Sequence, residues 1–532
     1  MGWVTGLAFG LNIGILVAAC IIDLCHNRKG EYKYPRKFIF VRFLNWITVG
    51  LTYACTYFGR YNISVMNTSD FHAFLGVTAT GYGTISTITF IVYATFVVVN
   101  GVIVDRIGGK TASIIGAAGS ALLNIVTGIY IQFVQMKGAG NIAIMAVLRS
   151  VNDYFQTFCT TAIVKVGVNW YHTSERGLFS GIFGVVIAFG FFLAFQVDGL
   201  IKSNLHYSLV FYIPGLLLAV FSFLCFFFVH ATPEDAGYPP VDDDAILEAE
   251  ERKRLLDNQE SVPINTADGD AASIQKAKGQ EKADYGMPLK DLLKVIFCNP
   301  VFLILCIVDF CVGWCRDGIL QWYPQYFQRV FNMDQASDMY QLASTCVTIG
   351  SMFGSFLAGI ISDFCCGSRR PPVAFAALIM YTGFIVMTIF AKHVIMGVFG
   401  IGLTSFCFSC VHGIITSTCA MDFAGAKATG TATGLLDGIQ KIGSALTGAV
   451  MGKIWDKFGS RGWLISLIPA SSVGAILLIP ILFKKPKTKE EKEADRIAAQ
   501  EKKDAKNAAA GNYQSFPTTT GYATLSDEET KV

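Results

Sequence analysis

Long apolar stretches separated by short polar turns make up most of the 532-residue chain. Twelve of these stretches are each close to the roughly 20 residues that an α-helix needs to cross a bilayer. The predicted spans are 40–66, 80–104, 109–134, 141–168, 178–200, 207–229, 297–325, 338–363, 372–392, 395–420, 429–452 and 462–484. A further apolar segment, from about Trp3 to Leu24, precedes them. Because the ten-residue alternation of membrane β-strands is absent, the pattern predicts an all-α polytopic membrane protein.

A polar insert separates the first six predicted spans from the last six. It contains an acidic run and a longer charged run, without the apolar periodicity that builds a core. We therefore predict a mostly disordered linker rather than a third domain. The expected organisation is an N-terminal anchor helix and basic segment at 1–37, a first six-helix half at 38–230, the linker at 231–296, a second six-helix half at 297–484 and a tail at 485–532.

Loop charges predict how the chain is oriented in the membrane. No basic residue precedes the first apolar segment, whereas Arg28, Lys29 and Lys33 follow it. Since basic loops are retained in the cytosol, we expect the N-terminus outside and the linker and C-terminal tail in the cytosol. Three basic residues are exceptions on the predicted outer side: Lys453, Lys457 and Arg461.

Composition narrows the possible functions. Only 15% of the residues are charged, against about 25% in ordinary soluble domains, and 53% are hydrophobic. This excludes a soluble globule and gives no support to nucleic-acid binding. The 15 cysteines lie mostly in apolar runs without zinc-ligand spacing. No nucleophile or nucleotide motif stands out, so we expect no enzyme activity, no cofactor, no metal and no nucleic-acid partner, and a monomer in the lipid bilayer.

The pattern Gly-x-x-x-Asp occurs at the end of the second predicted span of each half. It begins at Gly101 in the first half and at Gly359 in the second. Glycine lets two helices approach closely, and an aspartate there can pair across a gate; the alternative is a tight structural turn. With this repeat the chain resembles the major facilitator superfamily, which implies two six-helix halves that alternate access around a central site. The residues expected at the gate are Asp105, Arg106, Lys110, Asp363, Glu175 and Arg176.

Two arginines lie deep in predicted spans. Arg316 lies within the span at 297–325, where a central arginine costs at least roughly 2.5–3.5 kcal/mol to insert. Arg60 lies at an equivalent depth in the first half, which gives each half one arginine. Two guanidinium forks match phosphate oxygens in pairs and suit a phosphate dianion. The alternative is that Arg60 extends to the outer surface and Arg316 pairs with Asp309 or Asp317.

The motifs around both arginines are Tyr53-x-x-x-Tyr57-x-x-Arg60 and Arg316-x-Gly318-Ile319-x-x-Trp322-x-Pro324-x-Tyr326. Together they resemble the organophosphate:phosphate antiporter family of the superfamily, over about residues 38–484. The resemblance implies that the two arginines hold a phosphate group and that Tyr53 and Tyr57 line the same cavity. It also makes Lys441 an expected substrate contact. Ile187 stands where the family commonly has a histidine.

Other ionisable residues lie inside the predicted spans. Arg149 and Asp153 are four residues apart, as are Asp437 and Lys441, so each pair can form an ion pair within one helix. We expect this pairing for Arg149 and Asp153, and it is the alternative to substrate contact for Lys441. His412 and Asp437 are candidate proton-coupling groups, with an interhelical hydrogen bond as the alternative role of His412.

These features predict a secondary active transporter of a phosphorylated small metabolite, of the sugar phosphate or glycerol 3-phosphate type, exchanged for inorganic phosphate by alternating access. Two alternatives stay open. One is a proton-coupled or facilitative carrier of another organic anion. The other is a non-transporting sensor that uses the linker and tail to bind partners.

Short signals concern modification and location. Asn67 begins a glycosylation sequon in a predicted outer loop, where we expect it to be accessible, which predicts a glycoprotein. Motifs similar to sorting signals occur in the linker and the tail. The expected location is the plasma membrane, an endolysosomal membrane or the endoplasmic reticulum membrane.

Overall fold

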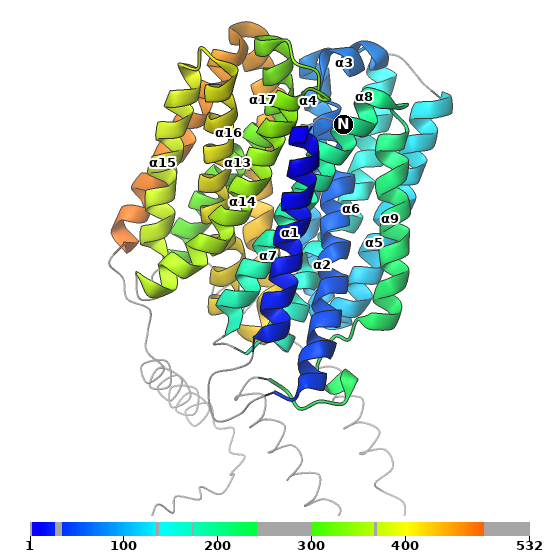
Figure 1. Ribbon diagram of the computed structural model, residues 1–532, viewed down its shortest axis with the longest axis vertical. Coiled ribbons are helices and arrows are strands. Elements are labelled where there is room, and N and C mark those ends of the chain that lie inside the picture. The colour runs from blue at the N-terminus through cyan, green and yellow to red at the C-terminus, as the bar shows by residue number, and fades with distance from the viewer. Residues whose placement is uncertain are drawn as a thin grey trace, which may run out of the picture. The chain divides into compact units, whose positions relative to one another are not determined.

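The structure, a computed structural model, describes residues 3–26, 34–134, 138–172, 175–241, 300–365 and 370–482. These residues form helices and connecting loops without a β-strand, as the sequence predicts. The part before the linker contains α1 (Trp3–Cys25), α2 (Arg36–Val65), α3 (Ser69–Leu75), α4 (Ala79–Ile107), α5 (Gly109–Ile129), α6 (Ala139–Trp170), α7 (Arg176–Phe191), α8 (Asp198–Asn204) and α9 (Leu209–Phe228). The later part contains α13 (Pro300–Phe331), α14 (Asp338–Phe364), α15 (Pro371–Ile389), α16 (Val394–His412) and α17 (Ala420–Leu478) (Figure 1).

Short segments of other helix types also occur among the described residues. Three are π-helical and two are 3₁₀-helical: Tyr130–Val134, Phe192–Val197 and Gly413–Cys419, then Glu234–Ala236 and Ile479–Ile481. Most of the predicted linker and the whole predicted tail lie outside the described residues.

The last two predicted spans form the two arms of α17. Gly459 has a φ of +65°, a left-handed conformation that glycine adopts without steric cost. After this turn the chain runs back along α13, because Trp463 Nε1 donates to the Gly318 carbonyl at 2.9 Å and Trp314 Nε1 to the Ser466 carbonyl at 3.0 Å. The rising numbers on α17 pair with falling numbers on α13, so the second arm is antiparallel to α13.

Nine described segments are long and apolar enough to cross a membrane by length and composition. The segment Thr431–Ile481 holds both arms of α17. The helices α6 and α13, each of 32 residues, are as long as the others but carry charged residues that lower their mean hydropathy. Most of those charged residues are buried, among them Arg149 and Asp153 in α6, and Asp309, Arg316 and Asp317 in α13. Charged residues at membrane depth that face the protein interior are typical of functional sites.

Glycines let the inner helices approach at backbone distance. A β-carbon placed on Gly83 of α4 would lie 2.6 Å from the Gly448 carbonyl oxygen of α17. One placed on Gly313 of α13 would overlap the Gln440 carbonyl oxygen, also in α17. Because those neighbours are backbone atoms, they cannot rotate away. The packing of α17 against both helices therefore depends on these glycines.

Gly313→Ala is expected to destabilise the protein by about 1–3 kcal/mol, the usual cost of overpacking. Gly383→Ala in α15 is the matched control, because a β-carbon at Gly383 would meet no atom within 4 Å. In the control, the higher helix propensity of alanine should leave stability unchanged or slightly raised. Thermal unfolding in detergent measures both, and equal unfolding temperatures for the two variants would show that the contact is not tight.

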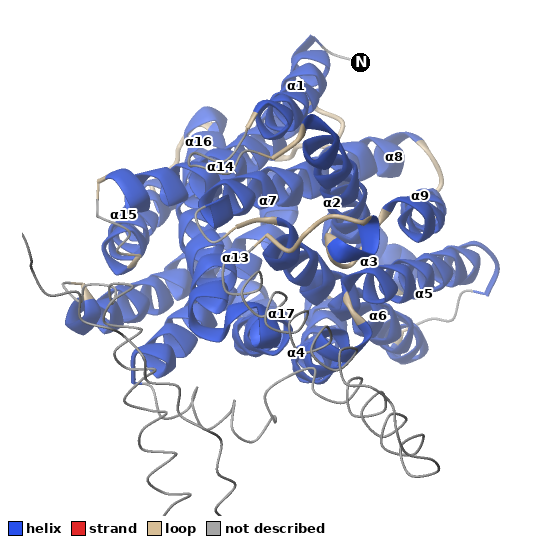
Figure 2. Ribbon diagram, turned by 90° about the horizontal axis from the view of Figure 1, so that it is seen from below, coloured by secondary structure: helices blue, strands red, loops and turns tan. Residues whose placement is uncertain are grey.

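The helix α1 lies at the edge of the bundle, beside α14, α7 and α2 (Figure 2). Its Ala19 packs in one apolar cluster with Val185 and Ala188 of α7 and Met352 of α14. Because α7 precedes the linker and α14 follows it, α1 contacts both halves. It is therefore placed where relative movement of the halves would change its packing.

A buried carboxylate fixes the end of α1 to the first half. Asp23 is fully buried and accepts hydrogen bonds from Trp46 Nε1 at 2.6 Å and from the Tyr171 hydroxyl at 2.9 Å. The Arg42 Nη2 atom lies 3.5 Å from its Oδ1 atom. Sequence reasoning did not single out Asp23, because its partners lie far along the chain.

Asp23→Ala is expected to lower stability and release α1, since each buried donor left without an acceptor costs about 1–3 kcal/mol. Trp46 fluorescence should change as its indole loses its acceptor, and thermal unfolding should begin at lower temperature. Cys25→Ala, at an exposed position on the same helix, should change neither. An Asp23→Ala protein with unaltered fluorescence and unfolding would show that α1 is held mainly by apolar packing.

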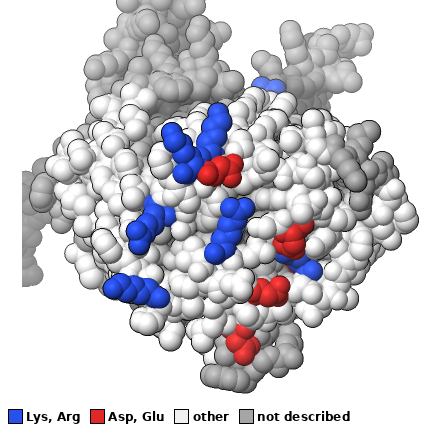
Figure 3. Space-filling model, turned by 90° about the horizontal axis from the view of Figure 1, so that it is seen from above, with Lys and Arg blue, Asp and Glu red and all other residues white. Residues whose placement is uncertain are grey.

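The end of the bundle at α3 carries basic side chains and a few acidic ones (Figure 3). The turn of α17 belongs to this end, because Asp456 accepts a hydrogen bond from Thr80 at the start of α4 at 2.6 Å. Three basic residues near that turn are exposed: Lys453, Lys457 and Arg461. They are the residues that depart from the expected placement of basic loops in the cytosol.

Candidate functional site

Arg60 lies in α2 with its guanidinium enclosed by polar and aromatic groups. Its Nε atom donates to Gln156 Oε1 at 2.7 Å, and its Nη2 atom lies 3.5 Å from the Tyr93 hydroxyl. The guanidinium carbon is 4.7 Å from the centre of the Tyr93 ring and 5.0 Å from that of Tyr57. Only 4% of Arg60 is exposed. It therefore faces the interior of the bundle rather than extending to the surface.

Arg316 lies across the interface between the halves from Arg60 and contacts the same tyrosine. Its Nη2 atom donates to the Tyr57 hydroxyl at 3.1 Å, and 1% of the residue is exposed. Tyr57 therefore has its ring against one arginine and its hydroxyl against the other. The two arginines, predicted from equivalent positions in the two halves, are brought together at one residue.

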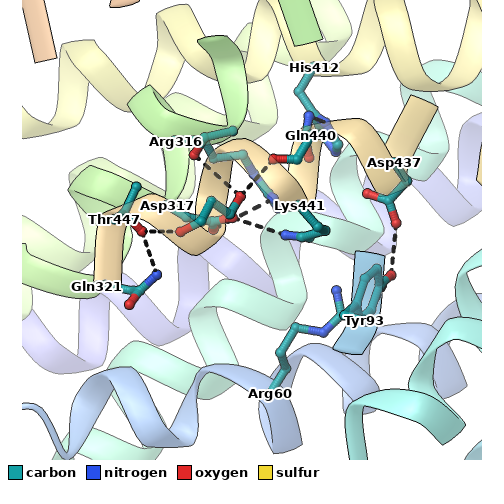
Figure 4. A network of polar contacts seen from close by, with 12 residues as sticks. Arg60, Tyr93, Arg316, Asp317, Gln321, His412, Asp437, Gln440, Lys441 and Thr447 are labelled. Carbon is teal, nitrogen blue, oxygen red and sulfur yellow. Dashed lines mark hydrogen bonds and ion pairs between the residues drawn. The ribbon is translucent and has the colours of Figure 1, made fainter. Parts of the chain in front are cut away.

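Asp317 is the centre of a hydrogen-bond network beside the arginines (Figure 4). Its Oδ2 atom accepts from Lys441 Nζ at 3.0 Å and from the Ser444 hydroxyl at 2.5 Å, and its Oδ1 atom accepts from the Tyr61 hydroxyl at 2.8 Å. Arg316 Nη1 lies 3.8 Å from Oδ1, at the long limit of an ion pair. The fully buried carboxylate thus balances the charge of Lys441 and part of that of Arg316.

The alternative of an ion pair between Asp437 and Lys441 within α17 is not supported. Lys441 instead binds Asp317, and Asp437 Oδ2 accepts from the Tyr93 hydroxyl of α4 at 2.8 Å. The two side chains point to different helices, so each joins α17 to a neighbour. Tyr93 also contacts Arg60, which connects Asp437 to the arginine of the first half (Figure 4).

Arg149 and Asp153 do form the predicted contact within α6, at 3.7 Å. Shorter bonds from Arg149 go to main-chain carbonyls of α2, at 2.9 Å to Gly59 and 2.8 Å to Arg60. Arg149 therefore holds the part of α2 that carries Arg60.

Contacts between the halves enclose the two arginines on both sides. On the side of α3, Asn67 Nδ2 donates to the Gln321 carbonyl at 2.7 Å. On the opposite side, Thr431 of α17 donates to Asp105 Oδ2 of α4 through its main-chain nitrogen at 3.0 Å and its hydroxyl at 2.8 Å. Hydrogen bonds between the halves therefore lie on both sides of the two arginines.

The predicted gate residues fall into groups. Asp105 joins the halves through Thr431 and also binds Lys165 Nζ at 2.8 Å. Arg106 is exposed, and Lys110 Nζ lies 5.7 Å from the centre of the Phe226 ring. Lys165 was not predicted, because it is far from Asp105 along the chain.

Glu175 lies among basic groups at the same end of the bundle. Its Oε1 atom is 3.3 Å from Arg42 Nη1 and 3.2 Å from His26 Nε2. It therefore connects the residues around α1 to the start of α7. The side chains of Arg176 and Asp363 lie outside the described part of the chain.

Asn67 is not the accessible sequon that we expected. It is 2% exposed, and besides its bond to Gln321 its Oδ1 atom lies 2.9 Å from His72 Nε2. Burial, with the nearby charge of Arg329, lowers the pKa of His72 to about 4, so the imidazole is neutral at pH 7 and donates to Asn67. The sequence could not show this, because the contact to Gln321 joins residues 254 positions apart.

The remaining predicted residues line the same interior region. Tyr53 is 3% exposed, and its ring centre lies 5.1 Å from that of Tyr57. His412 Nδ1 lies 2.9 Å from Gln440 Nε2, which is the interhelical hydrogen bond that was the alternative to a coupling role. Ile187 is buried in the apolar core.

Several curated proteins are similar to this chain at low identity. A glucose-6-phosphate exchanger SLC37A2 of Xenopus tropicalis is 25% identical over 395 residues, which cover 68% of this chain and 74% of that protein. A glycerol-3-phosphate transporter of Bacillus subtilis is 26% identical over 413 residues, covering 76% and 84%. The membrane sensor protein UhpC of Salmonella typhimurium is 23% identical over 466 residues, covering 86% and 94%.

Solved structures and family models agree on the fold. A bacterial homologue of the human lysosomal transporter Spinster, inward-facing and unoccupied, matches with a TM-score of 0.56 and 14% identity, over 83% of this chain and 95% of that one. The model of the Major Facilitator Superfamily matches residues 49–448 and 334–516. With its helical bundle and paired interior arginines, the chain belongs to the major facilitator superfamily.

Proposed function

We propose that this chain is a secondary active transporter that exchanges a phosphorylated small metabolite, of the sugar phosphate or glycerol 3-phosphate type, for inorganic phosphate. The observation that carries the proposal is the meeting of Arg60 and Arg316, one from each half, at Tyr57 in an enclosed site. Guanidinium groups stay charged when desolvated and bind phosphate oxygens in pairs. The names of the relatives, a glucose-6-phosphate exchanger and a glycerol-3-phosphate transporter, support the same class of substrate.

A phosphate group between the arginines would change the present contacts. It would replace the Tyr57 hydroxyl as the acceptor for Arg316 and compete with Asp317 for Lys441. Tyr53 and Tyr57 would then border the rest of the substrate. Because the anion would contact residues of both halves, its binding would favour the closed arrangement over open ones.

Opening toward either end requires contacts between the halves to break. We assign Asp105, with Thr431, to the gate at the end where α2 begins, and place Arg106, Lys110, Glu175, Arg176 and Asp363 with it. Exposed Arg36 and Lys37 also lie at this end, so we assign it to the cytosol. We propose a monomer with the linker and tail in the cytosol, in the plasma membrane or in an endolysosomal or endoplasmic reticulum membrane.

Counterflow in liposomes tests the proposal. Purified protein is reconstituted with phosphate inside, and uptake of labelled phosphate, glycerol 3-phosphate, phosphoglycerate and hexose phosphates is followed. Uptake of at least one compound should require phosphate on the opposite side. Uptake that does not depend on phosphate on the opposite side but does depend on a pH gradient would instead identify a proton-coupled carrier.

A sensor is the second candidate, favoured by the similarity to UhpC, which is named a membrane sensor protein. The two candidates differ in whether bound substrate is released on the other side. Saturable binding of an organophosphate to the purified protein, with no flux in the same liposomes, would identify the sensor.

A further inference from the structure

A second polar cluster lies beside the anion site and is not used by it. The Gln440 Nε2 atom of α17 lies 2.8 Å from Asp309 Oδ1 of α13 and 2.9 Å from His412 Nδ1 of α16. Asp309 and Gln440 are fully buried, and His412 is 8% exposed. Side chains from three helices of the second half therefore meet at one amide nitrogen. Figure 4 shows two of them, Gln440 and His412.

The contact between Gln440 and His412 suits a neutral imidazole. The amide nitrogen of Gln440 lies 2.9 Å from His412 Nδ1, which accepts from it in the tautomer that carries its proton on Nε2. Among the described residues, no hydrogen-bond partner contacts the buried Asp309 Oδ2 and Gln440 Oε1 atoms. The neutral imidazole cannot balance a negative charge on Asp309.

Asp309 also has no counter-ion within ion-pair distance among the described residues. The two nearby cationic side chains bind other residues, since Lys441 binds Asp317 and Arg316 binds Tyr57. An unpaired carboxylate in a water-poor interior is costly, and such groups take up a proton instead. The ionisable groups around Asp309 and His412 are Arg316 and Asp317 of α13, Asp437 and Lys441 of α17, and the thiols of Cys306 and Cys311.

We propose that Asp309 is a proton-binding site, positioned by Gln440 and His412, whose proton promotes binding of the anionic substrate. One proton from water binds to Oδ2, the oxygen that lacks a partner, while Oδ1 keeps its bond to Gln440. When the halves open and water reaches the cluster, the proton can leave to water. A hydronium ion delivers the proton, so one of its O–H bonds breaks and water is left as the O–H bond on Asp309 forms, and no other covalent bond changes.

The coupling follows from charge and position. An ionised Asp309 would add a negative charge beside Arg316 and Lys441 and so oppose a phosphate group there. A proton and an anion should therefore each raise the affinity for the other, as reciprocal linkage requires.

Infrared spectroscopy of the purified protein without substrate tests the proton itself. The difference between the spectra of the wild type and Asp309→Asn should contain the carbonyl stretch of one buried carboxylic acid, whereas any band from the buried Asp198 is present in both proteins and cancels. Gln440→Leu should shift the band, because Oδ1 loses its hydrogen bond. Asp338→Asn, which changes an exposed aspartate at the start of α14, should keep the wild-type band. A difference spectrum between the wild type and Asp309→Asn without a carboxylic acid band would overturn the proposal.

Phosphate binding measured against pH tests the coupling, and this part rests on the proposed function. The affinity of wild type should fall about tenfold more per pH unit than that of Asp309→Asn once Asp309 ionises, as for a single proton. Comparing the two proteins cancels the titration of phosphate itself. Parallel pH profiles would overturn the coupling. Absence of phosphate binding at every pH would instead count against the proposed function, and the infrared result would still stand.

Discussion

Arg60→Lys and Arg316→Lys are each expected to reduce phosphate-dependent counterflow at least about 100-fold. Two buried, charge-assisted hydrogen bonds to an anion are together worth about 3–6 kcal/mol, and 100-fold corresponds to about 2.8 kcal/mol. Lysine keeps the charge but cannot offer the planar fork. It also cannot keep the present geometry, in which Arg60 reaches Gln156 through Nε and Arg316 reaches Tyr57 through Nη2.

The matched control is Arg329→Lys, since Arg329 is exposed at the end of α13. It should transport at the wild-type rate. Each variant should also be checked for monodisperse elution and for thermal unfolding, so that lost flux is not confused with lost protein. Wild-type counterflow by both Arg60→Lys and Arg316→Lys would contradict the assignment of the arginines to the substrate.

Asp317→Asn is expected to destabilise the protein by about 3–5 kcal/mol, the cost of leaving a buried ion pair with one partner. The change removes the negative charge that balances Lys441. It also replaces a carboxylate oxygen by an amide group beside Lys441 and Ser444, which both donate to that carboxylate. Lys441 is 1% exposed, so water cannot replace the lost contact. Thermal or chemical unfolding in detergent measures the loss.

A second substitution tests whether the lost stability comes from the unpaired charge of Lys441 or from the altered shape of residue 317. The double variant Asp317→Asn, Lys441→Met removes both members of the pair and should recover at least half of the lost stability, because no lysine charge is then left buried. Excess phosphate should also stabilise Asp317→Asn more than the wild type, since an anion can neutralise Lys441. If the single variant is as stable as the wild type, the network around Asp317 does not determine stability.

The sequence was enough to predict how far along its helix a residue lies, but not which residues of other helices it contacts. Counting from the predicted span ends placed Arg60 and Arg316 at equivalent positions, and both are buried in the bundle. The partner of Lys441 was missed, because the choice between Asp437 on its own helix and Asp317 on another depends on which way α17 faces. The accessibility of Asn67 was also wrong, since the carbonyl of Gln321 that buries it lies on a distant helix.

The sequence by itself determined that the fold is all-helical, where the long apolar segments lie and that two arginines lie deep within them. These features follow from local requirements, because a membrane-spanning helix must be long and apolar whatever surrounds it. Only the tertiary structure decided which residues are in contact. It places Asp317 in an ion pair with Lys441 and Asp105 in hydrogen bonds with Thr431. It also packs α1 against both halves and places Gln440 in contact with Asp309 and His412. Such contacts depend on the rotation and packing of whole helices, and close approaches such as that at Gly313 set them more strongly than any local pattern does.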